Sequence, residues 1–413
     1  MGRRGGHDVF QTIEKQGALL SASLSVDLLD SALYTNGNPY QVWRAMREAG
    51  PVHHHVAKTG SQFWAVVGHE AGQRVLTDWK VFTSSRGAML REEDNSAPYP
   101  GAGKMPILTD PPRHTELRRA VARLFTPRAV RNLGALASEV AGSLLADLRA
   151  RGGGDFATDV AAKFPLAVQA EILGIAPEDL PLVLDATGRS VDEAEHAASG
   201  HHDVMAYFLK AIGTRRSEAG RDLIDALLTA RAGGLSLSDE EIVLTCDNIV
   251  VAASQTAQHA ASGSLLALLE HPEAWKALRE GRVGVGSAVE ELLRWTAPAT
   301  HAMRTAVCDT ELAGTTIRAG EAVAVWLPSA NRDGTVFADP DELVLDRSPN
   351  PHLTLGAGPH LCLGAALVRV LLRALLEDLI GADTSLALAN PPTWQSTWVI
   401  NRMRSLPVTV VPA

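Results

Sequence analysis

Cys362 is the side chain in this sequence that is best placed to do chemistry. It lies in the run 355–364, LGAGPHLCLG, whose glycines leave the approach to one sulfur free of side chains. The stretch 363–379 reads as an apolar helix, and the free N–H groups and dipole at a helix N-terminus favour a thiolate just before it. Such a sulfur suits a metal ligand or a nucleophile. The alternative is a buried thiol packed against a glycine turn.

Glu291 and Arg294 are the next candidates, because residues three apart share one face of a helix and can form an ion pair. At the surface, such a pair contributes almost nothing to stability. The apolar residues around this pair indicate a buried helix instead, and a buried pair needs a further partner. Arg347, shortly before the glycine loop, is the candidate partner, with a structural role.

Hydrophobic periodicity predicts the elements that position these residues. The predicted helices span 40–49, 69–76, 113–124, 128–151, 155–173, 177–190, 201–218, 222–230, 239–269, 272–279, 287–295 and 363–379, and short strands span 52–56, 63–67, 304–307, 322–327 and 406–411. Ser238 is the predicted N-cap of the helix over 239–269, and Ser287 with Glu290 forms a possible capping box. Helices dominate without alternating with strands, which predicts a mainly α fold with a small β region.

Composition narrows the class of protein. The chain has 413 residues, 46% hydrophobic and 21% charged, and no linker-like segment, which favours one compact domain over 1–413. A formal net charge of −9 disfavours nucleic acid as a partner. Three widely spaced cysteines suit a reducing cytoplasm. The N-terminal arm, 1–30, has no apolar run suited to a signal peptide, and polar residues interrupt the apolar stretch 242–269, so we expect no membrane span.

Several motifs together resemble a cytochrome P450 of the soluble bacterial type. The glycine-rich loop 355–364 ends in His-x-Cys-x-Gly, and it is preceded by Glu-x-x-Arg at 291–294 and by ANRD at 330–333. Further matches are DPPRH at 110–114, followed by Arg118, and GPV at 50–52. The order and spacing match over nearly the whole chain. The resemblance implies a cytochrome P450 fold, a single haem domain with a central distal helix over 239–269, and a monooxygenase activity.

The resemblance also implies roles for individual residues. Cys362 matches the axial thiolate ligand to the iron of haem b. The residues that match positions holding the haem propionates are His114, Arg118, Arg304 and His360. Gly356, Gly358 and Gly364 would let the backbone approach the haem or a neighbouring helix, and Glu291, Arg294 and Arg347 match the structural triad beneath the haem.

Two departures from the family pattern concern the loop and the central helix. Leu355 stands where phenylalanine is usual, which leaves iron ligation intact and affects redox tuning. The central helix reads Ala252-Ala253-Ser254-Gln255-Thr256, where the family has an acid before the threonine. Gln255 cannot relay a proton by ionising. Either water and Thr256, with Ser254, deliver protons and the enzyme inserts oxygen, or the substrate itself supplies the proton or hydrogen atom and the outcome is ring closure or coupling.

The resemblance further implies a substrate pocket and redox partners. The expected pocket residues are Met89, Leu90, Val251, Ala252, Thr300, His301, Ala302, Val399 and Ile400, which suit a medium-sized organic molecule with apolar surface. His301 is either a substrate partner or, more in keeping with its position, a histidine that caps a loop. No flavin or dinucleotide fingerprint follows the haem domain, so electrons are expected from a ferredoxin and its reductase or from a flavin donor, with O2 as co-substrate.

Two basic features have alternative interpretations. Six arginines on helices expected near the cysteine would suit electrostatic docking of an acidic donor or simply form a solvated face: Arg113, Arg119, Arg123, Arg128, Arg369 and Arg373. His53, His54 and His55 lie on a predicted strand, where alternate side chains diverge, so we interpret them as strand surface rather than a three-ligand metal site.

Two other classes of function compete with the monooxygenase. A non-catalytic haem sensor or carrier is disfavoured because it would need no proton donor such as Thr256. A cysteine-dependent hydrolase or transferase would need a base beside the sulfur, and it would leave Glu291–Arg294 and His114–Arg118 unexplained.

Overall fold

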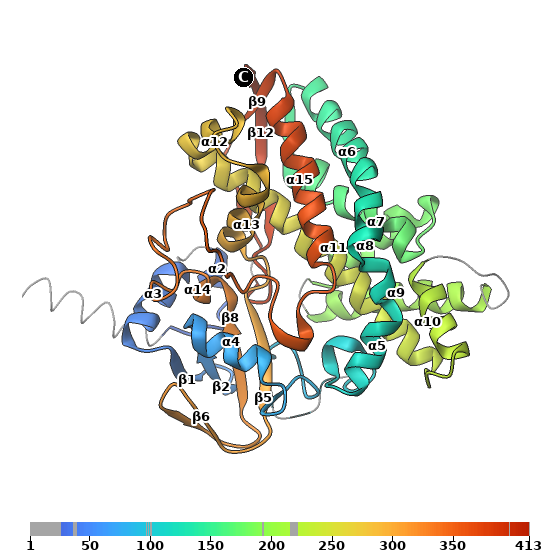
Figure 1. Ribbon diagram of the computed structural model, residues 1–413, viewed down its shortest axis with the longest axis vertical. Helices are drawn as coiled ribbons and strands as arrows, with labels where there is room; N and C mark the ends of the chain where they lie inside the picture. Colours follow the sequence, from blue (N-terminus) through green and yellow to red (C-terminus); the bar gives the residue numbers. More distant parts are fainter. Residues whose placement is uncertain are drawn as a thin grey trace, which may run out of the picture.

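The computed structural model describes residues 26–35, 39–95, 97, 99, 101–191, 194–214, 222–395 and 397–412. Most of the helices gather on one side of the molecule, and the larger sheet lies on the other (Figure 1). Residues 1–25 of the predicted N-terminal arm, 1–30, lie outside the described residues. The end of the arm is described, and there Leu28 and Leu29 are buried.

The helices form the greater part of the fold. They are α2 (Ala32–Thr35), α3 (Pro39–Ala49), α4 (His69–Thr77), α5 (Arg113–Ala122), α6 (Pro127–Ala150), α7 (Phe164–Leu173), α8 (Leu180–Arg189), α9 (Ala194–Thr214), α10 (Leu223–Ala232), α11 (Asp239–Glu270), α12 (Pro272–Arg279), α13 (Val285–Thr296), α14 (Leu327–Ala330) and α15 (Ala365–Gly381). The prediction of a mainly α fold is confirmed. The predicted helix over 201–218 begins earlier than expected, at Ala194, and its last predicted residues lie outside the described part of the chain.

The strands form several small sheets. They are β1 (Val52–Val56), β2 (Gln62–Val66), β3 (Phe82–Thr83), β4 (Gly153–Asp155), β5 (His301–Ala306), β6 (Thr310–Leu312), β7 (Thr315–Ile317), β8 (Ala322–Trp326), β9 (Thr384–Leu388), β10 (Thr393–Trp394), β11 (Met403–Ser405) and β12 (Pro407–Pro412). The largest sheet has the order β1-β2-β8-β5-β3, in which only β2 and β8 run parallel. A second sheet has the order β4-β12-β9.

The central strand β8 is buried on both faces, as its uninterrupted apolar sequence requires. Ala324 and Trp326 pack on one side with α3, while Val323 and Val325 pack on the other with α4. Because successive side chains of β8 point to opposite faces, this one strand contributes to two separate apolar clusters, one on each face of the sheet.

Helix α11 crosses the middle of the helical layer (Figure 1) and packs against α7, α9, α13 and α15. A capping box begins it: the Ser238 hydroxyl accepts from Glu241 N at 3.1 Å, and the Glu241 carboxylate accepts from Ser238 N at 2.8 Å. The prediction that Ser238 is the N-cap is confirmed. Helix α15 packs most extensively against α6, so the helix that follows the cysteine loop is held along its length.

Two local predictions are wrong. The stretch 155–173 is not one helix: β4 pairs with β12, a π-helical turn spans Ala157–Ala161, and α7 begins at Phe164. Backbone partners from the C-terminal strand capture the start of the segment, since Phe156 N donates to Leu406 O, and Pro165 suits the first turn of a new helix. The predicted capping box at Ser287 does not form either, because α13 begins two residues earlier, at Val285, and the Ser287 hydroxyl donates to Gly284 O.

Candidate active site

The loop 355–364 places Cys362 three residues before the first residue of α15. Cys362 N donates to Leu355 O at 2.8 Å, which closes the loop around the sulfur. The residue is exposed, yet protein atoms crowd around most of it. This crowding raises the pKa of the thiol by desolvation, against the opposing effects of the Gly364 N–H and of the charges on Arg118 and Arg369. Coordination to a metal would remove the proton outright.

Two of the loop glycines have backbone conformations that other residues rarely adopt. Gly356 and Gly358 have φ angles of 72° and 66°. A Cβ atom on Gly358 would lie 2.8 Å from Thr77 Cα and 2.9 Å from Leu76 O, so this glycine lets the loop pack against the end of α4. Gly364 has an ordinary φ of −83°, and a Cβ there would meet only Cys362 Sγ, at 3.9 Å.

The four predicted propionate-binding residues lie close to one another and to the cysteine loop. The rings of His114 and His360 have centroids 4.3 Å apart, and Arg118 donates to Leu361 O at 2.6 Å. Arg304 is 5% exposed, and the one hydrogen bond found for its guanidinium among the described residues goes to Met303 O. Burial lowers the pKa of Arg304 to about 10, and burial beside His360 and Arg118 lowers that of His114 to about 4.

Asp110 is the carboxylate of this cluster, and sequence reasoning gave it no role. It accepts hydrogen bonds from Thr83 Oγ1, from Ser84 N at 3.1 Å and from Ser84 Oγ at 2.8 Å, and its carboxylate lies 3.8 Å from His360 Nε2. Burial works to raise the pKa of Asp110, but the nearby His360 and the hydrogen bonds from Thr83 and Ser84 outweigh burial and lower it. Asp110 therefore stays ionised, and Ser84 Oγ, 3.1 Å from His360 Nε2, links the carboxylate to that ring. The DPPRH motif was the only sequence signal of Asp110.

The three residues predicted as a structural triad meet inside the protein. Arg294 donates to both oxygens of Glu291 at 2.7 Å, and Arg347 Nε donates to the same carboxylate at 3.1 and 3.2 Å. Arg294 also donates to three backbone carbonyls between 331 and 342. Sequence reasoning missed Asn350, which donates to Glu291 Oε2 at 3.1 Å. The network fixes the segment that leads into the cysteine loop.

The middle of α11 separates the three candidates for proton delivery. Thr256 is half-buried beside the exposed Ala252, to whose carbonyl its hydroxyl donates at 2.7 Å. Gln255 is 2% exposed, and its Oε1 has no hydrogen-bond partner among the described residues. Ser254 is buried and donates to Val250 O at 3.0 Å; helical geometry puts it nearly opposite Ala252 and Thr256. Ser254 therefore points away from Thr256, whereas Gln255 and Thr256 are adjacent residues about 100° apart around the helix.

A residue on a neighbouring helix anchors α11 at this point. Gln169 of α7 is 3% exposed and donates from Nε2 to Ala253 O at 3.1 Å. Its polar side chain within a mostly apolar helix, whose other polar residue is Glu171, was the one sequence signal that could have identified it.

The expected pocket residues come from α11, from the start of β5 with the residue before it, and from two further segments, around 89–90 and 399–400. Met303 N donates to Ala88 O at 2.7 Å, and Thr300 N donates to Val399 O at 3.2 Å. Leu90, Thr300, His301 and Ile400 are at most 5% exposed, so their side chains support the loops. The accessible members of the set are Met89, Val251, Ala252, Ala302 and Val399.

His301 has a supporting position rather than an open one. Its Nε2 accepts from Leu90 N at 2.9 Å, and its ring stacks on Trp326 with centroids 5.4 Å apart. Burial lowers its pKa to about 4, which keeps the imidazole neutral. The structure thus favours the loop-capping interpretation over a hydrogen bond to substrate.

The two basic features differ in part from the expectation. Arg113 donates to Glu241 at 2.7 Å and Arg369 donates to Glu290 at 2.6 Å, so ion pairs occupy two of the six arginines. Arg119, Arg123, Arg128 and Arg373 are exposed. In the histidine run, His55 is buried and lies 3.2 Å from Asp27 Oδ1, and His54 packs on Trp64. Among the described residues, no three His, Cys, Asp or Glu side chains are grouped as metal ligands.

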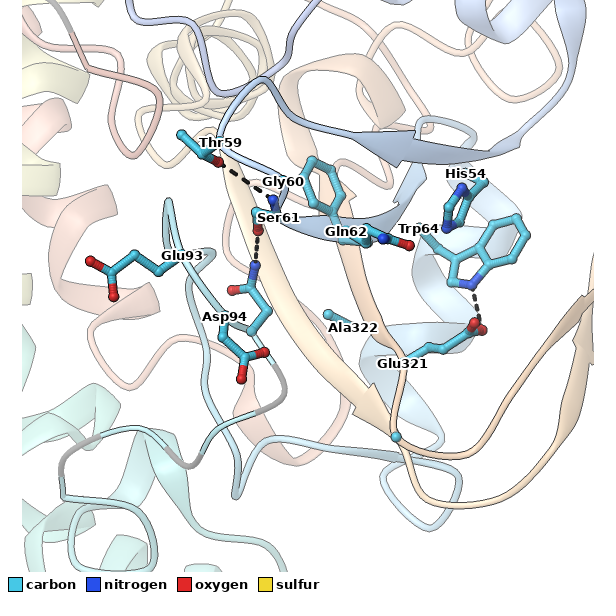
Figure 2. A pocket seen from close by; sticks show the side chains of 13 residues that line it. His54, Thr59, Gly60, Ser61, Gln62, Trp64, Glu93, Asp94, Glu321 and Ala322 are labelled. Carbon is cyan, nitrogen blue, oxygen red and sulfur yellow. Dashed lines mark hydrogen bonds between the residues drawn. The ribbon is translucent and has the colours of Figure 1, made fainter.

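A surface groove of about 470 Å³ opens at the end of the larger sheet (Figure 2). Trp64 Nε1 donates to Glu321 at 2.6 Å on one side of it, and Asn95 donates to Ser61 Oγ at 2.7 Å on the other. None of the predicted site residues belongs to its lining. This groove is therefore separate from the candidate active site.

Known proteins identify the family of the site. The family model described as "Cytochrome P450" matches residues 167–282 and 285–381. The chain belongs to the cytochrome P450 family. It is 33% identical to a nocardicin C N-oxygenase from Nocardia uniformis subsp. tsuyamanensis over 363 residues, which cover 85% of this chain and 90% of the relative. The chain is thus a P450 oxidoreductase of the monooxygenase type, with relatives in bacterial secondary metabolism.

Solved P450 structures share the whole fold. The P450 OxyD, involved in the biosynthesis of vancomycin-type antibiotics, superposes with a TM-score of 0.87 at 32% identity, covering 94% of this chain and 100% of OxyD. CxnD, a P450 for C–S bond formation in chuangxinmycin biosynthesis, gives 0.81 at 29% identity, covering 94% and 99%. Within the described residues, no helix has the length and apolar character needed to cross a bilayer.

The P450 family implies a haem–thiolate cofactor, and the described residues fit it. Among the residues that the structure describes, no carboxylate is hydrogen-bonded to the buried Arg304, and no partner is found for the buried His114 Nδ1. Such groups suit a ligand that brings its own acids to this position. Cys362 is exposed and lies close to these groups. Arg118, one of the four predicted propionate-binding residues, donates to Leu361 O in the cysteine loop.

Proposed function

We propose that this chain binds haem b through Cys362 and inserts one oxygen atom from O2 into a medium-sized organic molecule in bacterial specialised metabolism. The observation that carries the proposal is an accessible Cys362 next to buried Arg304 and buried His114 Nδ1, neither of which has a carboxylate hydrogen-bonded to it among the described residues. In this proposal, Arg304, His114, Arg118 and His360 hold the propionates, and the loop glycines shape the cysteine loop. The bound haem supplies the redox chemistry that activates dioxygen.

Thr256 and Gln255 are the proposed proton-handling residues. The Thr256 hydroxyl donates to Ala252 O, so its oxygen is free to accept a hydrogen bond from water or from a protonated group. Gln255 Oε1 has no partner in the described structure and can orient water, but the side chain cannot change charge. Proton delivery by ordered water through these two side chains accounts for the absence of an acid.

The substrate is proposed to contact the accessible side chains Met89, Val251, Ala252, Ala302 and Val399. All are apolar, and no titratable side chain belongs to this set. The pocket therefore favours a molecule that presents apolar surface towards Ala252 and Thr256.

Intramolecular ring closure or coupling is the second candidate function. Gln255 favours it because such a reaction need not draw every proton through an enzyme acid, and the related CxnD carries out C–S bond formation. A third candidate, a haem sensor or carrier, would bind ligands without turnover.

Two measurements test these proposals. The CO complex of the reduced holoenzyme is expected to show the red-shifted absorption band of thiolate ligation, and Cys362→Ser should abolish that band. An unchanged spectrum in Cys362→Ser would contradict the ligand assignment. For the reaction, product mass distinguishes a gain of one oxygen from a loss of two hydrogens, and binding without any product indicates a sensor or carrier.

The electron donor is proposed to be a small acidic ferredoxin, with its reductase, or a flavin protein. The exposed arginines Arg119, Arg123, Arg128 and Arg373 support this choice, because they lie on or next to α5, α6 and α15 and carry no ion pair among the described residues. Electrostatic steering towards these side chains would speed association.

A further inference from the structure

A cavity of about 560 Å³ lies along the second half of α11, apart from the predicted substrate residues. Helix α11 contributes His259, Gly263, Leu266, Ala267 and Glu270, whose spacing places them on one face of the helix. The opposite wall includes Tyr40 of α3, Thr296 of α13 and Asn401. From His259 to Glu270 the helix rises by about 16 Å, so the cavity extends over roughly three turns.

The same face of α11 continues into the candidate active site. Gln255 and Thr256 precede His259 by four and three residues, and side chains at these spacings are neighbours, about 5–6 Å apart at Cβ. One line of side chains on α11 therefore joins Thr256 and Gln255 to His259 and then to the cavity.

His259 is unusual for a buried polar side chain. It is 3% exposed, and neither Nδ1 nor Nε2 has a hydrogen-bond partner among the described residues. A buried imidazole without partners is costly, so water is the expected partner at a residue that lines a cavity with polar walls. Burial, together with the charge of Arg402, lowers the pKa of His259 to about 3, so the ring is neutral with one donor and one acceptor nitrogen.

We propose that His259 passes protons between water in this cavity and the water held by Gln255 and Thr256, in place of the missing acid. One ring nitrogen accepts a proton from cavity water while the other releases its own proton to water beside Gln255. The imidazole stays neutral and ends as its other tautomer, and rotation of the ring restores the starting arrangement. The proposal rests on the proposed function, because reduction of dioxygen consumes these protons.

Glu270 adds a proton-exchanging group at the far end of the same cavity. Glu270 is exposed, yet the protein atoms around its carboxyl group raise its pKa by desolvation, so it holds a proton more readily than a fully solvated glutamate does. Between the two ends, Gly263 lets Thr296 of α13 approach α11 closely, since a Cβ on Gly263 would lie 2.8 Å from Thr296 Cγ2. The route would therefore run from Glu270 past Gly263 to His259.

His259→Gln and His259→Phe test the route in the holoenzyme. Gln keeps a donor and an acceptor but cannot exchange tautomers, so both variants should lower product formed per electron by a factor on the order of 10² and raise peroxide release. Ser264→Ala is the control: Ser264 is on the same helix, is 1% exposed, and its hydroxyl has no partner within the described part of the chain, but it is not part of the cavity wall. This control should behave as the wild type. If His259→Gln keeps the wild-type coupling and solvent isotope effect, the proposal is wrong.

A second measurement does not depend on turnover. The measurement is 15N NMR of the reduced, CO-bound holoenzyme labelled with 15N-histidine. The His259 resonances are assigned by their absence in His259→Phe, and in the wild type they should show a neutral ring averaged between two tautomers. A single fixed tautomer would overturn the route. Failure of the wild type to turn over any substrate would count against the proposed function alone, because the tautomer measurement would still stand.

Discussion

Glu291 and Arg294 form a two-pronged ion pair in which both side chains are completely buried, with both N–H···O distances at 2.7 Å. The carboxylate also accepts from Arg347, Asn350 and Val344 N, so its acceptor sites are filled. The pair ties α13 to the segment 331–350, which leads directly into the cysteine loop. We therefore expect both the stability of the fold and the binding of haem to depend on the Glu291–Arg294 pair.

Glu291→Gln should lower the free energy of unfolding by roughly 3–5 kcal/mol, because it leaves buried Arg294 without its counter-charge. Urea denaturation of the holoenzyme measures the change. Glu280→Gln is the matched control, since Glu280 pairs with Arg282 at the surface, with side chains 47% and 55% exposed, and it should change stability by about 0–1 kcal/mol. Equal effects of the two substitutions would show that burial of the pair has no special role.

Gly358→Ala should reduce the fraction of protein that retains haem. The substitution forces alanine to adopt a φ of 66°, at a cost of about 1–2 kcal/mol, and it pushes the new methyl group against Thr77 Cα and Leu76 O. Gly364→Ala, with an ordinary φ and no close contact, serves as the comparison. The ratio of haem absorbance to protein absorbance after purification gives the result, and similar ratios would argue against the tight packing on α4.

Gln255→Glu should increase product per electron and decrease peroxide release, because a carboxyl group beside Thr256 can relay protons by ionising. Peroxide and product are measured in the same reaction. Gln258→Glu adds the same charge on the side of α11 nearly opposite Thr256, two residues along the helix, and should leave both quantities unchanged. Unchanged peroxide in Gln255→Glu would mean that proton supply does not limit coupling.

The pair Glu290–Arg369 should give a pH-dependent stability. Hydrogen bonds from Arg369 and His352 outweigh burial and lower the pKa of Glu290 from 4.5 to about 2. Because the folded-state pKa is depressed, its stabilising effect is fully present above pH 4.5 and is lost as the pH falls towards 2. The difference in Tm between the wild type and Glu290→Gln should stay constant from pH 7 to 5 and shrink below 4.5. A Tm difference between the wild type and Glu290→Gln that grows as the pH falls would contradict this prediction.

Reduction by an acidic ferredoxin should slow as ionic strength rises, because the exposed arginines on or next to α5, α6 and α15 attract the donor. Arg373→Gln should lower the rate several-fold at low salt, whereas Lys210→Gln, exposed on α9, should not. Stopped-flow measurements of haem reduction compare the two variants. A rate that does not depend on salt would exclude steering through this face.

The sequence predicted those features of the site that depend on local spacing. The Glu291–Arg294 pair follows from i, i+3 geometry, and Cys362 before α15 follows from the apolar run after the glycine loop. Partners contributed by distant segments were not predictable in this way. Asn350 and Val344 reach Glu291 from an irregular segment, and Asp110 meets Ser84 across a loop, so no periodicity signals them.

The wrong local predictions also arise from long-range contacts. Glu290 was assigned to a capping box with Ser287, but its carboxylate instead accepts hydrogen bonds from Arg369 of α15. The stretch 153–155 pairs with β12, more than 250 residues away in sequence. His259 was visible only as a polar interruption of an apolar helix, and its cavity depends on α3, α13 and Asn401.

Helix α15 sets the distance between the sulfur and the end of the chain. Its 17 residues span about 25 Å, and β9 and β12 pair beyond its far end. A reductase fused after β12 would therefore begin a full helix length from Cys362. An extended tether of at least about eight residues would be needed merely to return to the cysteine face, so tether length should govern electron delivery in any self-sufficient fusion of this enzyme.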